Sequence, residues 1–151
     1  RVPFFCVAPI SGLVLAYREL SRAVGAEQPF YGLEHPGIQA GSEPALTVEV
    51  IAEQLLVDVL EIMDARYPGR CFQLGGWSMG GIVAVEMARQ LRCRAQVHSD
   101  SDNGETAEDG TTGAMSVGAQ LESVVLIDSP APVGGVPATS RAEMLRTLAA
   151  D

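Results

Sequence analysis

The sequence predicts an α/β fold in which helices flank a mostly parallel sheet. Four short runs, residues 3–7, 30–33, 71–75 and 123–127, are rich in apolar residues, a pattern typical of parallel strands covered on both faces. Segments with helical periodicity separate these runs, so strands and helices alternate along the chain. Such alternation favours parallel strands joined by right-handed crossover connections.

Three segments between the strands are predicted to be helical. Residues 47–67 give the clearest pattern, because Thr47 can cap the start and a Pro-Gly pair follows the end. Residues 13–24 and 79–91 have the same character over shorter lengths. The apolar residues that recur at helical spacing in the first of these segments are Val48, Ile51, Leu55, Leu56, Val59, Ile62 and Met63.

Length and composition indicate one globular domain. The chain has 151 residues, of which 47% are hydrophobic and 19% are charged, enough to bury a real core. The net charge of −9 argues against a nucleic-acid partner. No apolar run reaches the roughly 18 residues of a membrane-spanning helix. The first apolar run starts too early for a signal peptide and without an initiator Met, so we expect an excised domain.

The three cysteines, Cys6, Cys71 and Cys93, are an odd number without the spacing of metal ligands. Cys6 and Cys71 lie in apolar runs, so they are expected to be buried thiols of a reducing compartment, which points to the cytoplasm.

Two segments depart from the alternating pattern. Residues 95–118 combine acidic residues with Ser, Thr and Gly and have almost no large apolar side chains. We therefore expect a disordered surface insertion, with an acidic docking tail as the alternative. Residues 140–143 form a capping box that would open a further helix, which the chain enters before its last residue, Asp151.

The segment Gly75-Gly76-Trp77-Ser78-Met79-Gly80-Gly81 contains the pattern G-x-S-x-G. The pattern alone is weak, but a predicted strand precedes it and a predicted helix follows it. A turn this sharp holds the serine in a strained conformation and needs glycine on both sides, where a side chain would meet neighbouring backbone. It would place the Ser78 hydroxyl at the carboxyl edge of the sheet as a nucleophile. The alternative is a glycine-rich turn that only joins strand to helix.

A serine nucleophile needs an oxyanion hole, an acid and a base. The first N–H donor expected for the hole is that of Met79, the residue after the serine. The second is expected from the loop after the first strand, residues 8–12, where Ile10 is our candidate. A plain connecting loop is the alternative there.

Beyond these patterns, the chain resembles the thioesterase domains of polyketide synthases and non-ribosomal peptide synthetases, which have the α/β-hydrolase fold. The resemblance covers most of the chain outside 95–118, although many relatives carry histidine where Ala8 stands. Trp77 and the paired glycines favour the synthase-integrated domains over stand-alone editing thioesterases. The segments that carry the resemblance are 3–7 with 9–12, 17–20, 29–33 with 36–37, 75–81, 88–91 and 125–130.

The resemblance implies the rest of the site and its chemistry. Asp128, at the end of the strand after the nucleophile helix, would be the triad acid; from the residues alone, it could equally cap the loop before Pro130. The substrate would be an acyl or peptidyl chain on the phosphopantetheine arm of an acyl or peptidyl carrier protein, a partner in the same polypeptide. The domain itself would need neither metal nor cofactor.

No histidine follows Asp128, although the order serine, acid, histidine requires the base there. His98 opens the polar segment and is expected to be solvated. His35 lies in the loop after the second strand, on the correct edge of the sheet but one strand further from Ser78. The resemblance implies a base well downstream, beyond a helical lid that would begin near residue 140, and further strands beyond 123–127.

Three functions remain open from the sequence. The first is the serine thioesterase, in which this chain alone lacks the base. The second is a non-catalytic hydrolase-fold module that docks a carrier protein, and the third is a hydrolase of oxygen esters. A lid and a strand-flanked histidine downstream of Asp151 would favour an enzyme.

Overall fold

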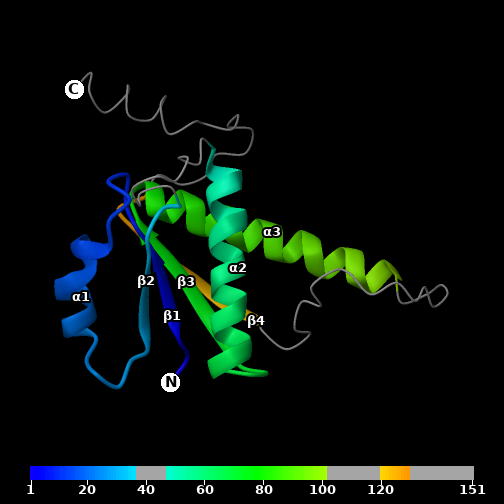
Figure 1. Ribbon diagram of the computed structural model, residues 1–151, viewed down its shortest axis with the longest axis horizontal. Helices are drawn as coiled ribbons and strands as arrows, with labels where there is room; N and C mark the ends of the chain where they lie inside the picture. The colour runs from blue at the N-terminus through cyan, green and yellow to red at the C-terminus, as the bar shows by residue number, and fades with distance from the viewer. Residues whose placement is uncertain (37–46, 102–119, 130–151) are drawn as a thin grey trace.

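The structure, a computed structural model, describes residues 1–36, 47–101 and 120–129. Strands and helices alternate along the chain as the sequence predicts (Figure 1). The elements are β1 (Phe4–Val7), a 3₁₀ turn η1 (Val14–Tyr17), α1 (Arg18–Ala23), β2 (Phe30–Leu33), α2 (Val48–Arg66), β3 (Cys71–Trp77), α3 (Met79–Ser101) and β4 (Gln120–Ile127).

The four strands form one sheet in the order β2-β1-β3-β4, and every neighbouring pair is parallel. This arrangement confirms the predicted fold class. The carboxyl ends of β1, β3 and β4 meet at one edge, where Val7 pairs with Gly76 and Trp77 pairs with Ile127. Within the described residues β4 is an outer strand, and it begins at Gln120, ahead of the predicted start at 123.

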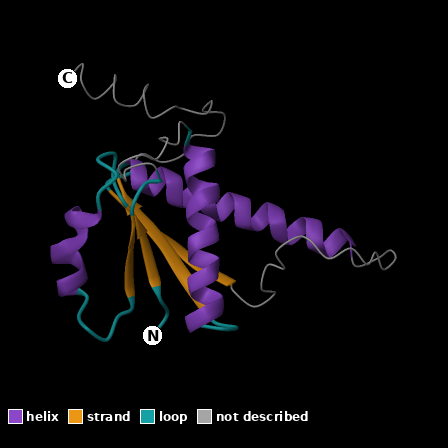
Figure 2. Cartoon of the chain, viewed as in Figure 1, coloured by secondary structure: helices purple, strands orange, loops and turns teal. Residues whose placement is uncertain are grey.

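Helices α2 and α3 cover one face of the sheet, and α1 lies apart from them (Figure 2). Their apolar residues join Phe5 and Val7 of β1 and Phe72 and Leu74 of β3 in one buried core. The alternate residues of the strands point to the opposite face. On that face η1 approaches β2 so closely that a Cβ on Gly32 would lie 2.8 Å from Val14.

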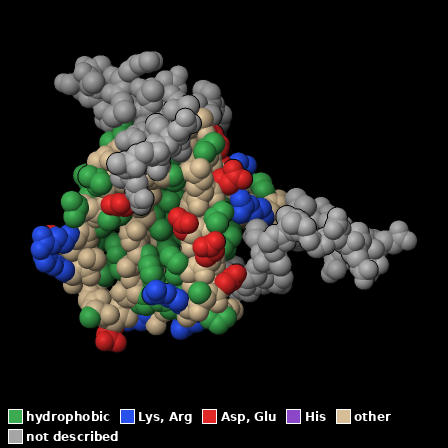
Figure 3. All heavy atoms as spheres, in the orientation of Figure 1, with side chains coloured by type: hydrophobic (Ala, Val, Ile, Leu, Met, Phe, Trp, Pro, Cys, Tyr) green, Lys and Arg blue, Asp and Glu red, His purple; other side chains and the backbone are tan. Residues whose placement is uncertain are grey.

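Helix α2 is the predicted helix, because its capping residue and apolar stripe agree with the pattern. The Val50 N–H donates to the Thr47 hydroxyl at 3.3 Å, and the apolar stripe is buried apart from a half-buried Ile62. Acidic side chains lie on the other side of the helix, and Figure 3 shows them as a red row along it. The helix is therefore amphipathic, and its inner stripe anchors the core.

The two shorter helix predictions were wrong in their boundaries. Residues 13–24 form the 3₁₀ turn η1 followed by α1, instead of one helix. Helix α3 does not end at Leu91 but continues to Ser101, so the expected insertion cannot begin at residue 95. The sequence between these points holds good helix formers such as Arg, Gln and Ala. The helix therefore continues where the lack of large apolar residues predicted an irregular segment.

Several predictions fall outside the described residues. They include the remainder of the polar segment, 102–118, and the helix predicted to open at 140. None of the described helices is long and apolar enough to span a membrane.

Candidate active site

Ser78 occupies the turn between β3 and α3, as the sequence predicts. Its φ of 55° lies in the left-handed region, which costs a residue other than glycine about 1–2 kcal/mol. The Gly81 N–H donates to the Ser78 carbonyl at 3.0 Å and closes the turn. A half-buried serine at a strained strand-to-helix turn is the geometry that the G-x-S-x-G pattern predicts.

Close backbone contacts explain the glycines on both sides of Ser78. A Cβ on Gly76 would lie closer than 3.0 Å to the backbone of Gly80. A Cβ on Gly80 would lie as close to the carbonyl oxygens of Val7 and Ala8 on the neighbouring strand. Separations this short do not occur for real Cβ atoms, and backbone cannot move aside cheaply. The prediction that side chains here would meet neighbouring backbone is confirmed.

Asp128 directly follows β4, beside the end of β3. Trp77 and Ile127 are paired across the two strands, so Ser78 and Asp128 are the next residue of each. The Ser78 N–H donates to the Ile127 carbonyl at 3.1 Å and ties the two strand ends together. Asp128 is exposed and, like Ser78, has a left-handed backbone, with a φ of 43°. The described residues with positive φ, glycines aside, are these two.

Ser129 adds a second connection between the strand ends. Its hydroxyl lies 3.3 Å from the Gly76 carbonyl and 3.1 Å from the Ile127 carbonyl. It also lies against Gly81, where a Cβ would overlap the Ser129 hydroxyl. The loop that carries Asp128 is therefore packed against the first turn of α3.

The loop after β1 forms a tight turn beside this edge. The Gly12 N–H donates to the Pro9 carbonyl at 2.7 Å, and the φ of Gly12 is 75°, a conformation suited to glycine. The turn includes Ile10, the candidate second oxyanion donor. Met79, the first candidate, opens α3 and is buried, and N–H groups in the first turn of a helix have no acceptor within that helix.

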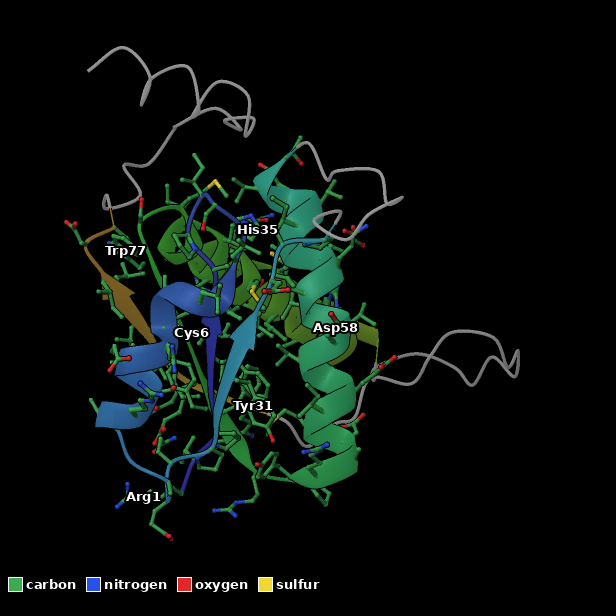
Figure 4. All side chains as sticks on the ribbon, turned by 60° about the vertical axis from the view of Figure 1, so that its left-hand side comes forward. Arg1, Cys6, Tyr31, His35, Asp58 and Trp77 are labelled. Carbon is green, nitrogen blue, oxygen red and sulfur yellow. The ribbon has the colours of Figure 1, made fainter. Side chains whose placement is uncertain are left out.

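His35 lies in the loop after β2, and β1 separates that strand from β3. The expectation that His35 is one strand further from Ser78 is therefore confirmed. The imidazole is buried, and its Nε2 forms a hydrogen bond of 2.9 Å with the Ala8 carbonyl. Figure 4 places His35 and Trp77 toward the same end of the molecule, opposite Arg1. The side chain of His98 lies outside the described residues.

Sequence reasoning missed a functional candidate, Tyr17. The residue is 4% exposed, and its hydroxyl bridges the ends of β1 and β3 through Val7 and Trp77. The sequence placed it in a predicted helix and in the resemblance segment 17–20 but gave it no role, and a buried tyrosine resembles any other aromatic core residue. The available signal was its polar tip, since a buried tyrosine hydroxyl usually has a hydrogen-bond partner.

Within the described residues, no group of three or more His, Cys, Asp or Glu side chains is placed to hold a metal ion. The nearest fixed partial charge to the candidate nucleophile is the positive N-terminus of α3, which begins at the next residue. Developing negative charge on an oxyanion beside Ser78 would be favoured there.

The parallel sheet and the strand–turn–helix around Ser78 are those of the α/β-hydrolase fold. The model of the thioesterase domain family matches residues 2–99. The chain therefore belongs to the thioesterase domain family.

Known relatives are large biosynthetic enzymes. The chain is 34% identical over 92 residues to a dimodular nonribosomal peptide synthase of Bacillus subtilis. This match covers 61% of this chain and 4% of that protein. It is 32% identical over 138 residues to orsellinic acid synthase armB of Armillaria mellea, covering 91% of this chain and 5% of that protein. The chain thus spans about a twentieth of the length of these curated relatives.

A solved structure shows the same fold. The NocB thioesterase domain, in covalent complex with a fluorophosphonate nocardicin G analogue, matches with a TM-score of 0.51 and 28% identity. The match covers 63% of this chain and 40% of that chain.

Proposed function

We propose that this chain is part of a serine thioesterase that releases an acyl, polyketide or peptidyl chain from the phosphopantetheine thioester of a carrier protein. The Ser78 hydroxyl attacks the thioester carbonyl and expels the thiol of the arm, leaving the acyl group on Ser78 as an ester. Water then releases an acid, or a nucleophile within the acyl chain releases a ring. The proposal places the protein in the cytoplasm, with the carrier in the same polypeptide.

The observation that carries the proposal is the strained backbone of Ser78 beside Asp128. A serine with a φ of 55° stands where glycine would avoid the strain, at the edge of the sheet where α/β proteins bind ligands. Asp128 follows the paired residue of the neighbouring strand. We assign Asp128 as the acid that would orient the catalytic base and stabilise its charged form.

The oxyanion is assigned to two backbone N–H groups, those of Met79 and Ile10. Met79 lies at the N-terminus of α3 and Ile10 in the turn after β1, and β1 and β3 are neighbours in the sheet. Donors held by backbone turns need no reorganisation as charge develops, which is why such holes lower the barrier. The arm and its thiol belong to the carrier, so the proposal requires neither metal nor cofactor in this chain.

The base is proposed to follow Asp128 in a longer polypeptide. Residues 129–151 contain no histidine, and the relatives are many times longer than the matched segment. His35 is a poor substitute because β1 separates its strand from β3.

The direct test is a fluorophosphonate probe, followed by intact-mass spectrometry, on the longest natural polypeptide that contains these residues. We expect one covalent adduct on the wild type and none on Ser78→Ala, with turnover of an acyl thioester lowered on the order of 10⁶-fold. The control is Ser21→Ala, which removes an exposed hydroxyl of α1 and should leave both readouts unchanged. An adduct that persists in Ser78→Ala would overturn the nucleophile assignment.

Residues 1–151 alone provide a test of the missing base. We expect no thioester turnover above background, because a carboxylate such as Asp128 is far too weak a base for an alcohol. The assay requires protein shown to be folded by circular dichroism and monomeric by gel filtration. Turnover that His35→Ala abolishes would make His35 the base. Turnover that survives substitution of both histidines would refute the mechanism.

A further inference from the structure

The Tyr17 hydroxyl lies between the ends of two adjacent strands. It donates to the Val7 carbonyl at 2.5 Å and accepts from the Trp77 N–H at 2.8 Å. Val7 is the last residue of β1, and Trp77 is the last of β3 and the residue before Ser78. A phenol has one donor hydrogen and can also accept, so both functions of this hydroxyl are in use.

The hydroxyl lies at the last rung of the ladder between β1 and β3. The Gln73 N–H donates to the Pro3 carbonyl at 2.9 Å. Hydrogen bonds between parallel strands recur at every second residue, so the same series leads from this pair to the Trp77 N–H and the Val7 carbonyl. At that rung the tyrosine hydroxyl is bonded to both the donor and the acceptor.

The first turn of α3 packs against the same strand end. Gly80 packs against the carbonyl oxygens of Val7 and Ala8 without space for a Cβ. Immediately beyond this point β1 continues into the turn with Ile10, and β3 continues into Ser78 and Met79. The separation of the two strand ends therefore sets the separation of the two proposed oxyanion donors.

We propose that Tyr17 is a positioning residue that sets the spacing of the Ile10 and Met79 amides for the oxyanion by bridging the last residues of β1 and β3. The inference rests on the proposed function, because the two amides matter only if Ser78 is the nucleophile. Tyr17 acts through the backbone and does not touch the substrate. Burial also raises its pKa well above the ordinary range, so the hydroxyl stays protonated and remains a donor to Val7.

The test compares Tyr17→Phe with a matched control, Tyr31→Phe. Tyr31 lies on β2, and its hydroxyl is 2.9 Å from the Tyr67 hydroxyl, so this control also removes one tyrosine hydrogen bond. The measurements are kcat and KM for an acyl N-acetylcysteamine thioester, the rate of fluorophosphonate labelling, and urea unfolding, all on the polypeptide used for Ser78→Ala.

For Tyr17→Phe we expect kcat and the labelling rate to fall by about 10²-fold, the scale of displacing one oxyanion donor, with KM little changed. Tyr31→Phe should lose stability but keep kcat. A crystal structure of Tyr17→Phe should show a changed distance between Val7 O and Trp77 N. Unchanged kcat and labelling in folded Tyr17→Phe would overturn the positioning role. So would an equal loss in Tyr31→Phe, because the effect would then follow stability alone.

The same measurements separate this inference from the proposed function. If Ser78→Ala retains its adduct, the proposed function fails whatever Tyr17→Phe does. If Ser78→Ala loses its adduct and Tyr17→Phe labels at the wild-type rate, only the role of Tyr17 fails.

Discussion

The two ends of the parallel sheet use left-handed backbone in different ways. At the amino ends, Gly25 precedes β2 with a φ of 86° and Gly69 precedes β3 with a φ of 70°. A Cβ at either position would meet nothing within 4 Å. These two residues are therefore glycine for conformation alone, since glycine adopts positive φ without strain.

At the carboxyl ends of β3 and β4 the relation is reversed. Ser78 and Asp128 take the left-handed conformation although neither is glycine. The glycines beside them, Gly76 and Gly80, are required by contact with neighbouring backbone. The chain thus accepts strain where it places a hydroxyl and a carboxylate and avoids strain in the turns at the other end. Strain retained at two polar residues on adjacent strands favours a chemical role for both over a connecting turn.

The comparison predicts that the same substitution has different effects at the two ends. We expect Gly80→Ala to lower the free energy of unfolding by about 3 kcal/mol, because its Cβ would overlap two carbonyl oxygens that cannot move independently. Gly25→Ala should cost only about 1 kcal/mol, because it adds backbone strain in open space. Urea titrations of the wild type, Gly80→Ala and Gly25→Ala measure both changes in the free energy of unfolding.

Gly69→Ala is the second control, because Gly69 also has positive φ and open space. It should behave as Gly25→Ala does. The distinction between the two ends would be refuted if Gly80→Ala were no less stable than these two variants.

The sequence was sufficient to predict the sheet and the nucleophile turn because both depend on local patterns. Runs rich in apolar residues predicted β1 to β4, and the glycines around Ser78 predicted a turn too tight for side chains. The helix boundaries were harder, because α3 continues past Leu91 into a segment without helical apolar periodicity. The prediction that Cys71 is buried was wrong: it is half-buried, as the first residue of β3.

The connections across the site could not be predicted in this way. Tyr17 reaches Trp77 across 60 positions of sequence, and Ser129 reaches Gly76 across 53. Neither pair has a spacing that any secondary structure repeats. Such contacts depend on the order of the strands, which is a property of the folded sheet.

The smallest expected effect concerns the reactivity of the three thiols. Cys6 lies on β1 and is fully buried, whereas Cys71 begins β3 and Cys93 is exposed on α3. Burial raises the pKa of Cys6 to about 11, with a smaller opposing effect from the Tyr17 hydroxyl. Because the thiolate is the reactive form, a thiol reagent such as Ellman's should modify Cys93 and Cys71 in the folded protein. It should reach Cys6 only after unfolding.

The raised pKa of Cys6 also fixes the sign of a pH effect on stability. The folded state holds the proton more tightly than the unfolded chain, so this contribution is complete below the ordinary pKa of 9.0 and is lost as the pH rises toward 11. We expect urea titrations from about pH 8 to about pH 10 to show the free energy of unfolding falling less in Cys6→Ala than in the wild type. The upper limit stays near the ordinary pKa of tyrosine, about 10, so that Tyr17 adds little. Equal losses of unfolding free energy in the two proteins would show that Cys6 is not shielded from solvent in the folded protein. Labelling of native Cys6 as fast as Cys71 would show the same.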